Sequence, residues 1–258
     1  MLDTLGAIVG PATALWLLGV FDYHYPSLFA VTLVPGLLAV GVIVFLVAEK
    51  KRTPVPHISF GDRVRMLPAA YRRFLVAVGL FGAGDFAHTL LILLATQKLI
   101  PGFGATKAAS IAIALYVLHN IFYAGFAFVA GWLADRFRKN LVLATGYALA
   151  AVMALLIIAL PASVWMLGAV FVLGGIYVGI EETLEDSLCA ELVDEAHHGM
   201  AFGVLATVNG IGDFLSSAIV GLLWSVAGTT VAFGYSATLF CAGAVLVARL
   251  RAGGDFPE

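Results

Sequence analysis

The chain has 258 residues, of which 62% are hydrophobic and only 12% are charged, and its formal net charge is −2. A soluble domain is about half apolar and about a quarter charged, so this composition excludes a water-soluble globular fold. A membrane-spanning helix needs about 20 mostly apolar residues. Such runs recur along the chain, separated by short stretches that collect charge and proline. We therefore expect an all-α, polytopic membrane protein.

About eight apolar runs are long enough to be transmembrane helices. They exceed any β-strand in length, and the alternating pattern of a transmembrane barrel is absent from the sequence. The predicted spans cover residues 5–20, 28–48, 74–95, 108–133, 141–160, 164–180, 201–227 and 230–250. Residues 49–73 carry prolines and basic side chains, and we interpret them as a cytoplasmic linker. This linker divides two helices in residues 1–48 from a six-helix bundle in residues 74–258.

Basic residues are distributed unevenly between the two predicted sides of the membrane. All of the 14 Lys and Arg residues except Lys98 and Lys107 fall on one side. By the positive-inside rule we expect this side, with both termini, to be cytoplasmic in a multi-pass protein of the cell (inner) membrane. Cys189 is expected in a cytoplasmic loop and Cys241 inside the last span, so both should be free thiols.

Polar side chains inside the spans are the main indication of function, because they are costly in lipid. The candidates for a substrate pathway or a proton-coupling site are Asp85, His88, His119, Asn120, Asn209 and Asp213. Asp85 and His88 lie three residues apart on one helix face and could together bind and release a proton. The alternative is that these groups only form hydrogen bonds between helices. Spans 28–48, 141–160 and 230–250 hold no internal charge, and we expect them to face lipid.

Glycines recur at helical spacing in several spans. Gly6 with Gly10, and Gly203 with Gly210, are examples. Small residues at this spacing allow two helices to approach closely. We expect most of them to serve packing.

The loop between spans 108–133 and 141–160 reads G-W-L-A-D-R-F-R-K-N from residue 131 to residue 140. It resembles the G-x-L-x-D-R-x-G-R-R signature of the major facilitator superfamily, with departures at Arg138 and Asn140. The resemblance implies a cytoplasmic gate, in which Asp135 pairs with a neighbouring helix and the basic residues hold the membrane surface. The gate candidates are Gly131, Asp135, Arg136, Arg138 and Lys139, with Glu181 and Glu182 as acidic partners for the basic loop.

Two further segments resemble the same family. Gly6 followed by Gly10 and Pro11 is similar to the fifth helix of such a transporter, and residues 199–203 are similar to the start of the eleventh. The resemblance implies that the chain corresponds to helices five to twelve of a twelve-helix fold and lacks the first four. It implies a permease or efflux protein that moves a small solute by alternating access, of which this chain is a truncated and inactive part.

The partners implied are membrane lipid, a small-molecule substrate, a proton as the candidate coupling ion, and a second chain that would supply the missing helices. A non-transporting partner subunit is one alternative. A membrane-embedded enzyme is another, although the sequence contains no H-E-x-x-H motif and no nucleophile elbow. We expect no catalytic residue, cofactor, metal or nucleic-acid partner.

Overall fold

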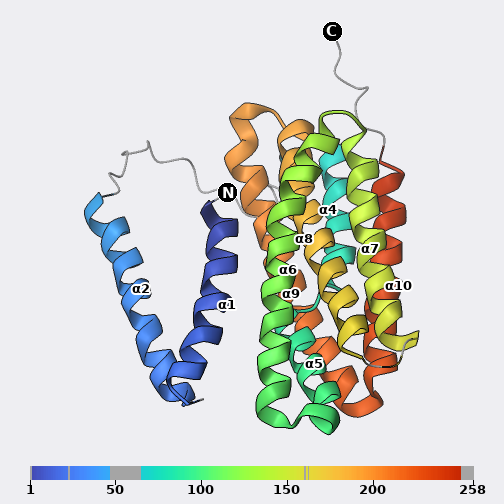
Figure 1. Cartoon of the computed structure of the whole chain (residues 1–258). Helices are drawn as coiled ribbons and strands as arrows, with labels where there is room; N and C mark the ends of the chain where they lie inside the picture. The colour runs from blue at the N-terminus through green and yellow to red at the C-terminus, as the bar shows by residue number, and fades with distance from the viewer. Residues whose placement is uncertain (1, 23, 47–64, 160, 162, 251–258) are drawn as a thin grey trace.

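The computed structural model describes residues 2–22, 24–46, 65–159, 161 and 163–250. All regular elements in these ranges are helical, which confirms the all-α expectation. The first two helices, α1 (Leu2–Val20) and α2 (Tyr25–Leu46), form a hairpin beside a larger bundle (Figure 1). The bundle contains α4 (Ala69–Gly82), α5 (His88–Phe103), α6 (Ala105–Ala134), α7 (Lys139–Ala159), α8 (Val164–Leu192), the short 3-10 helix η1 (Glu195–His197), α9 (His198–Ala227) and α10 (Thr229–Ala248).

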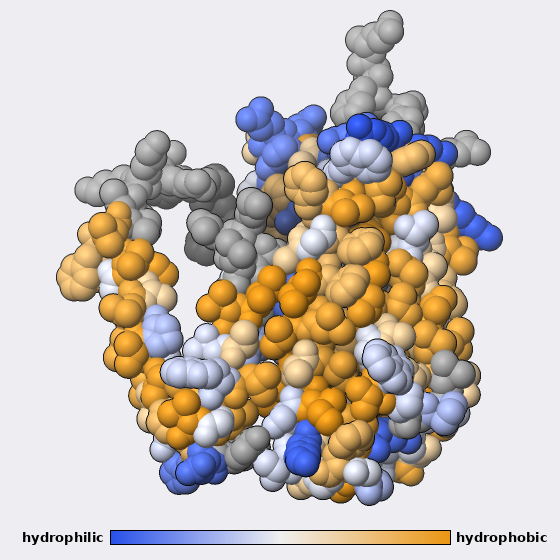
Figure 2. All heavy atoms as spheres, viewed as in Figure 1, coloured by the Kyte–Doolittle hydropathy of each residue, from blue (hydrophilic) through white to orange (hydrophobic). Residues whose placement is uncertain are grey.

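In the described part of the chain, six helices are long and apolar enough to cross a membrane. They are α2, α6, α7, α8, α9 and α10. On the face shown in Figure 2, a broad apolar band lies between more polar ends. The other two predicted spans are α1, whose apolar segment Ile8–Val20 is shorter, and the segment 74–95, which is broken. The expected polytopic membrane architecture is thus confirmed.

The single helix predicted for residues 74–95 is wrong, because α4 ends at Gly82 and α5 begins only at His88. At this interruption the backbone packs closely against α9 and α10. A Cβ atom on Gly84 would lie 2.9 Å from the Cβ of Leu239 on α10, and one on Gly212 of α9 would lie 3.0 Å from the carbonyl carbon of Gly82. A side chain would not fit at either contact, so glycine is needed there.

The sixth predicted span is also wrong at its end, because α8 continues from Ile180 to Leu192. At 1.5 Å per residue its 29 residues reach about 43 Å, which exceeds the hydrocarbon core of about 30 Å. Cys189 therefore lies in a helix rather than in a loop, and it is buried. Cys189 and Cys241 are both free thiols, as expected.

The closest helix packing occurs at glycines other than the four examples named above. Gly6, Gly10, Gly203 and Gly210 have no neighbouring atom within 4 Å of a built Cβ. Among the closest contacts are two on α8, where Gly175 packs on the backbone of His119 and Gly179 packs on the backbone of α6 one turn further along. The bundle is built around this α6–α8 contact and the equally extensive α7–α10 contact.

The predicted lipid-facing spans are only partly right. α2 is exposed along nearly its whole length, whereas α7 is the most buried of the six long helices and packs between α8 and α10. The least buried of the long helices of the bundle are α6 and α9, which carry predicted site residues. In α6 the polar residues His119 and Asn120 are nevertheless buried, whereas Asp213 of α9 is exposed. Absence of charge therefore did not predict exposure to lipid.

Candidate functional site

The break between α4 and α5 is held by side chains from two other helices. Tyr235 on α10 donates a hydrogen bond to the carbonyl oxygen of Ala83 at 3.0 Å. Ser216 on α9 donates to the carbonyl oxygen of Asp85 at 2.5 Å, and the neighbouring Ser217 accepts from the Ala87 amide at 3.0 Å. Non-helical backbone at membrane depth is tolerated only where such groups satisfy it. The break is therefore a stable part of the folded bundle, held by these hydrogen bonds.

Asp85 and His88, at the two sides of this break, share a partner on α8. The Tyr177 hydroxyl donates to Asp85 Oδ1 at 2.9 Å and lies 3.4 Å from His88 Nε2. Tyr177 is fully buried, so this contact is shielded from solvent. The one phenol therefore links a carboxyl group and an imidazole.

A second imidazole extends this cluster. The His119 ring on α6 lies 4.6 Å from the His88 ring, centroid to centroid. His119 is 2% exposed, and its Nδ1 lies 3.2 Å from the carbonyl oxygen of Phe171 on α8, so Nδ1 is the donor. This bond leaves Nε2 as the ring nitrogen that can exchange a proton. The four side chains form a contiguous chain of titratable groups across α4–α5, α6 and α8.

Asp85 and His88 open onto a cavity of about 380 Å³. Its walls are Gly82, Asp85, Phe86, Ala87, His88, Val178, Glu181, Glu182, Asn209 and Asp213. Four of these residues carry carboxyl groups, and no lysine or arginine is among them. The size lies at the lower end of the range for small-molecule sites, about 300–1,000 Å³. The chemistry suits a solute or ion that can neutralise or protonate carboxyl groups.

A smaller cavity of about 160 Å³ adjoins it along α8. Glu181, Glu182 and Asn209 line both cavities, and Glu185 lines only the smaller one. Glu185 is 2% exposed and accepts hydrogen bonds from Tyr147 on α7 and, at 2.8 Å, from the Asn209 amide. The Tyr123 hydroxyl on α6 donates to Glu182 in the same way. Glu182 and Glu185 are thus each matched to a hydrogen-bond donor from another helix.

The structure brings most of the predicted pathway residues together. Asp85, His88, Asn209 and Asp213 line the larger cavity, and His119 reaches it through His88. Asn120 does not join them, because its amide donates to the Tyr116 carbonyl oxygen of its own helix at 2.8 Å.

Glu181 and Glu182 lie elsewhere than predicted. They line the carboxylate cavity beside Asp85, since α8 continues as a helix past them. The rest of the predicted gate, Gly131 and residues 135–139, lies at the end of α6 and the start of α7. There the Lys139 Nζ atom lies 2.8 Å from Glu191 Oε2, and the Arg136 guanidinium lies 3.8 Å from the centre of the Trp132 ring. Glu191 is therefore the acidic partner that the basic loop contacts.

Sequence reasoning missed Tyr147, Tyr177 and Glu185. Tyr177, Glu181 and Glu185 follow one another at intervals of four residues, which places them on one face of a helix. The signal was therefore present, but it required α8 to continue beyond Ile180. Tyr147 lies in a span without internal charge, and no pattern in that span pointed to a functional partner.

Comparison with known proteins gives consistent results. Residues 74–256 match the family model of the Major Facilitator Superfamily. The chain is 29% identical over 224 residues to an uncharacterized MFS-type transporter of Methanocaldococcus jannaschii. The alignment covers 87% of this chain but 56% of that relative, so the chain spans little more than half the length of the relative it matches.

Proposed function

Because the chain belongs to the Major Facilitator Superfamily of membrane transporters, we propose that it forms the carboxyl-terminal half of a proton-coupled secondary transporter. On this proposal a small solute crosses by alternating access, through a site near the middle of the membrane. The observation that carries the proposal is the break at residues 83–87, which presents Asp85 and His88 to the carboxylate-lined cavity. Discontinuous helices of this kind form substrate and ion sites in secondary transporters.

The proposed coupling group is the linked set of Asp85, Tyr177, His88 and His119. Glu181 and Glu182 face it from α8, and Asp213 and Asn209 face it from α9. A proton taken up by Asp85 or His88 changes the charge of the cavity and so changes its affinity for a solute. Because each access state holds the proton with a different affinity, binding can be coupled to the conformational change.

The proposal is tested by the pH dependence of transport in a full-length protein that contains this half. Asp85→Asn and His88→Gln should each remove or displace the pH optimum of proton-driven solute uptake in liposomes. Asp194→Asn, an exposed carboxyl group outside both cavities, is the matched control and should keep the wild-type profile. A wild-type profile in both site variants would reduce the cluster to a structural role.

A second test concerns the chain by itself. We propose that these helices do not transport alone, since an alternating-access cavity needs an opposing half, supplied by a longer chain or a second one. The purified chain in liposomes should show no uptake above protein-free vesicles in a solid-supported-membrane screen of small solutes. Saturable uptake would contradict this and indicate that copies of the chain assemble into a complete transporter.

The orientation in the membrane also belongs to the proposal, with the end that carries Arg136 and Arg138 in the cytoplasm of a cell (inner) membrane. Cys189 is buried and cannot report on it, so single cysteines are needed in a Cys189→Ala, Cys241→Ser background. A membrane-impermeant maleimide should label Lys107→Cys in intact cells and should label Arg138→Cys only after lysis. The reverse pattern would invert the topology.

A further inference from the structure

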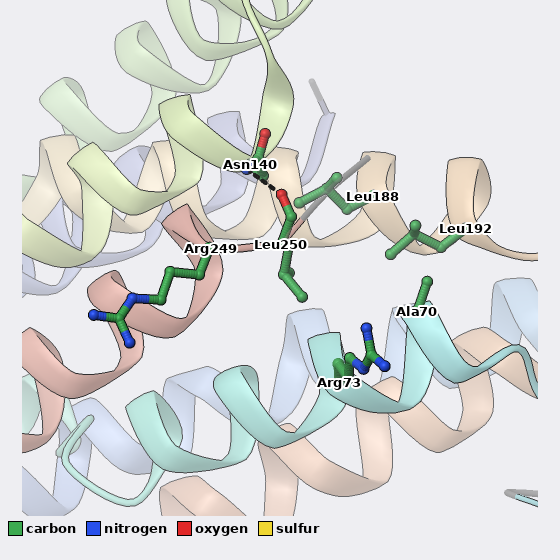
Figure 3. Close-up of a pocket in the computed structure, with 7 residues that line it drawn as sticks. All are labelled: Ala70, Arg73, Asn140, Leu188, Leu192, Arg249 and Leu250. Atoms are coloured by element: carbon green, nitrogen blue, oxygen red, sulfur yellow. Dashed lines mark hydrogen bonds between the residues drawn. The ribbon is translucent and has the colours of Figure 1, made fainter. Parts of the chain in front are cut away.

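A second cavity lies at the end of the bundle where α4 and α7 begin and α8 and α10 end (Figure 3). It encloses about 300 Å³ and lies apart from the carboxylate cavity, with which it shares no lining residue. We call it the arginine pocket, after Arg73 on α4 and Arg249 at the end of α10. Nothing in the proposed transport cycle uses it.

The arginine pocket carries positive charge that no described carboxylate of the chain neutralises. In the part of the chain that the structure describes, neither the Arg73 nor the Arg249 guanidinium has a carboxylate within 4 Å. Glu191, beside the lining residue Leu192, is already paired with Lys139. Among the described residues that line the pocket, none carries a carboxylate. Two guanidinium groups thus border one cavity whose other described lining residues are uncharged.

The rest of the pocket wall consists of apolar side chains and of backbone that hydrogen bonds hold in place. Leu188 and Leu192 on α8 and Leu250 after α10 give it an apolar side. Asn140, at the start of α7, donates its amide to the Leu250 carbonyl oxygen at 2.8 Å and lies 3.3 Å from the carbonyl oxygens of Val247 and Ala248. These bonds tie the end of α10 to α7 and so fix the backbone from which Arg249 extends.

We propose that the arginine pocket binds a phosphate-bearing anion, either the headgroup of an anionic phospholipid or a soluble phosphate compound. A guanidinium presents a planar fork of N–H donors that matches phosphate oxygens. Basic pockets between transmembrane helices at the membrane surface suit such headgroups, and the leucine side can accept the carbon atoms next to the phosphate. In Figure 3 Arg73 projects toward the pocket, whereas Arg249 reaches outward from the end of α10 and has to turn inward to share one phosphate. Arg73 should therefore contribute more to binding than Arg249.

The test is native mass spectrometry of the purified full chain in detergent, titrated separately with phosphatidylglycerol, phosphatidylcholine, glycerol phosphate and inorganic phosphate. The Arg73→Gln/Arg249→Gln variant should lose at least about tenfold in affinity for the phosphate-bearing anion that wild type retains, as expected for loss of charged hydrogen bonds. Arg73→Gln alone should account for most of that loss. Because both arginines are exposed at the surface, the variants should keep the gel-filtration profile of wild type.

The control is Arg72→Gln/Arg138→Gln, which removes equal charge from exposed arginines at the same end that do not line the pocket. Arginine-dependent preference for phosphatidylglycerol over phosphatidylcholine supports the site and assigns it to lipid. Arginine-dependent binding of glycerol phosphate or inorganic phosphate without that preference supports the site and assigns it to a soluble anion. Equal affinity of the Arg73/Arg249 variant and wild type, or an equal loss in the control, would overturn the proposal.

Discussion

The hairpin of α1 and α2 differs from the bundle of α4 to α10 in how its residues are buried, even between helices of similar hydropathy. α2 and α7 have nearly the same hydropathy, yet 6% of the apolar window of α2 is buried, against 56% for α7. Leu18 and Leu28 are the buried residues among the side chains of the hairpin that the structure describes. Hydropathy therefore identifies which segments belong in the membrane, but not which of them pack.

Packing in the bundle depends on two features that the described part of the hairpin lacks. One is backbone contact at glycines such as Gly175, and the other is hydrogen bonding between buried tyrosines and carboxyl groups such as Tyr147 and Glu185. In α2, Gly36 and Gly41 face open space, and among the described residues the hydroxyl of Thr32 bonds only to its own helix, at the Phe29 carbonyl oxygen. The contrast predicts that equivalent substitutions will have different effects in the two regions.

The largest difference in stability between the two regions is expected when a glycine is replaced by alanine. Gly175→Ala should destabilise the protein by about 3 kcal/mol or more and lower its unfolding temperature by about 6–12 °C, because the new methyl group overlaps the backbone of His119. Gly41→Ala in α2 should leave the unfolding temperature unchanged or slightly raised, since alanine favours the helix and nothing lies within 4 Å. Heating in detergent followed by fluorescence-detected gel filtration measures both. If the two variants changed the unfolding temperature equally, the two regions would not differ in how tightly their glycines pack.

The sequence was sufficient to predict most of this architecture. Long apolar runs separated by charged loops indicated the spans, and α6, α7, α9 and α10 lie within a few residues of their predicted limits. The sequence did not predict the helix break at residues 83–87 or the continuation of α8 after Ile180. The break between α4 and α5 depends on contacts of Gly82 and Gly84 with α9 and α10, far away in sequence. The extension of α8 depends on donors from α6, α7 and α9 that make its carboxyl groups tolerable.

The same reasoning explains the candidate site. Rare polar residues inside apolar spans pointed to Asp85, His88 and Asp213, which do lie in one cavity. Tyr177 could not be identified in this way, because tyrosine is common near membrane surfaces and its role here depends on a partner 92 residues away. Sequence patterns thus selected the costly groups, but not the residues that stabilise them.

The second prediction compares the loss of stability when a side-chain hydroxyl is removed in the bundle and in the hairpin. Tyr147→Phe should lower stability by about 1.5–3 kcal/mol, because it leaves the buried Glu185 without one of its two donors. Thr32→Val, which removes a hydroxyl that bonds only within α2, should change stability by no more than about 0.5 kcal/mol. Tyr116→Phe is the control inside the bundle, because its hydroxyl has no hydrogen-bond partner in the described part of the chain. Thermal unfolding of the three variants measures the effect, and a loss in Thr32→Val equal to that in Tyr147→Phe would contradict it.

The smallest effect is expected from the largest change, removal of residues 1–64. Tolerance of a truncation depends on the burial and bonding of what is removed, rather than on its length. The hairpin contacts the bundle through α1 on α6, while the bundle keeps its own glycine contacts and tyrosine–carboxyl bonds. Its unfolding temperature should therefore fall by no more than about 2–4 °C, which corresponds to about 1 kcal/mol for a protein of this size. A second variant that lacks only residues 1–46 separates the hairpin from the linker that follows it. If either truncation destabilises the bundle more than Gly175→Ala does, the α1–α6 contact is part of the folded core, and the two regions are one unit despite their different burial.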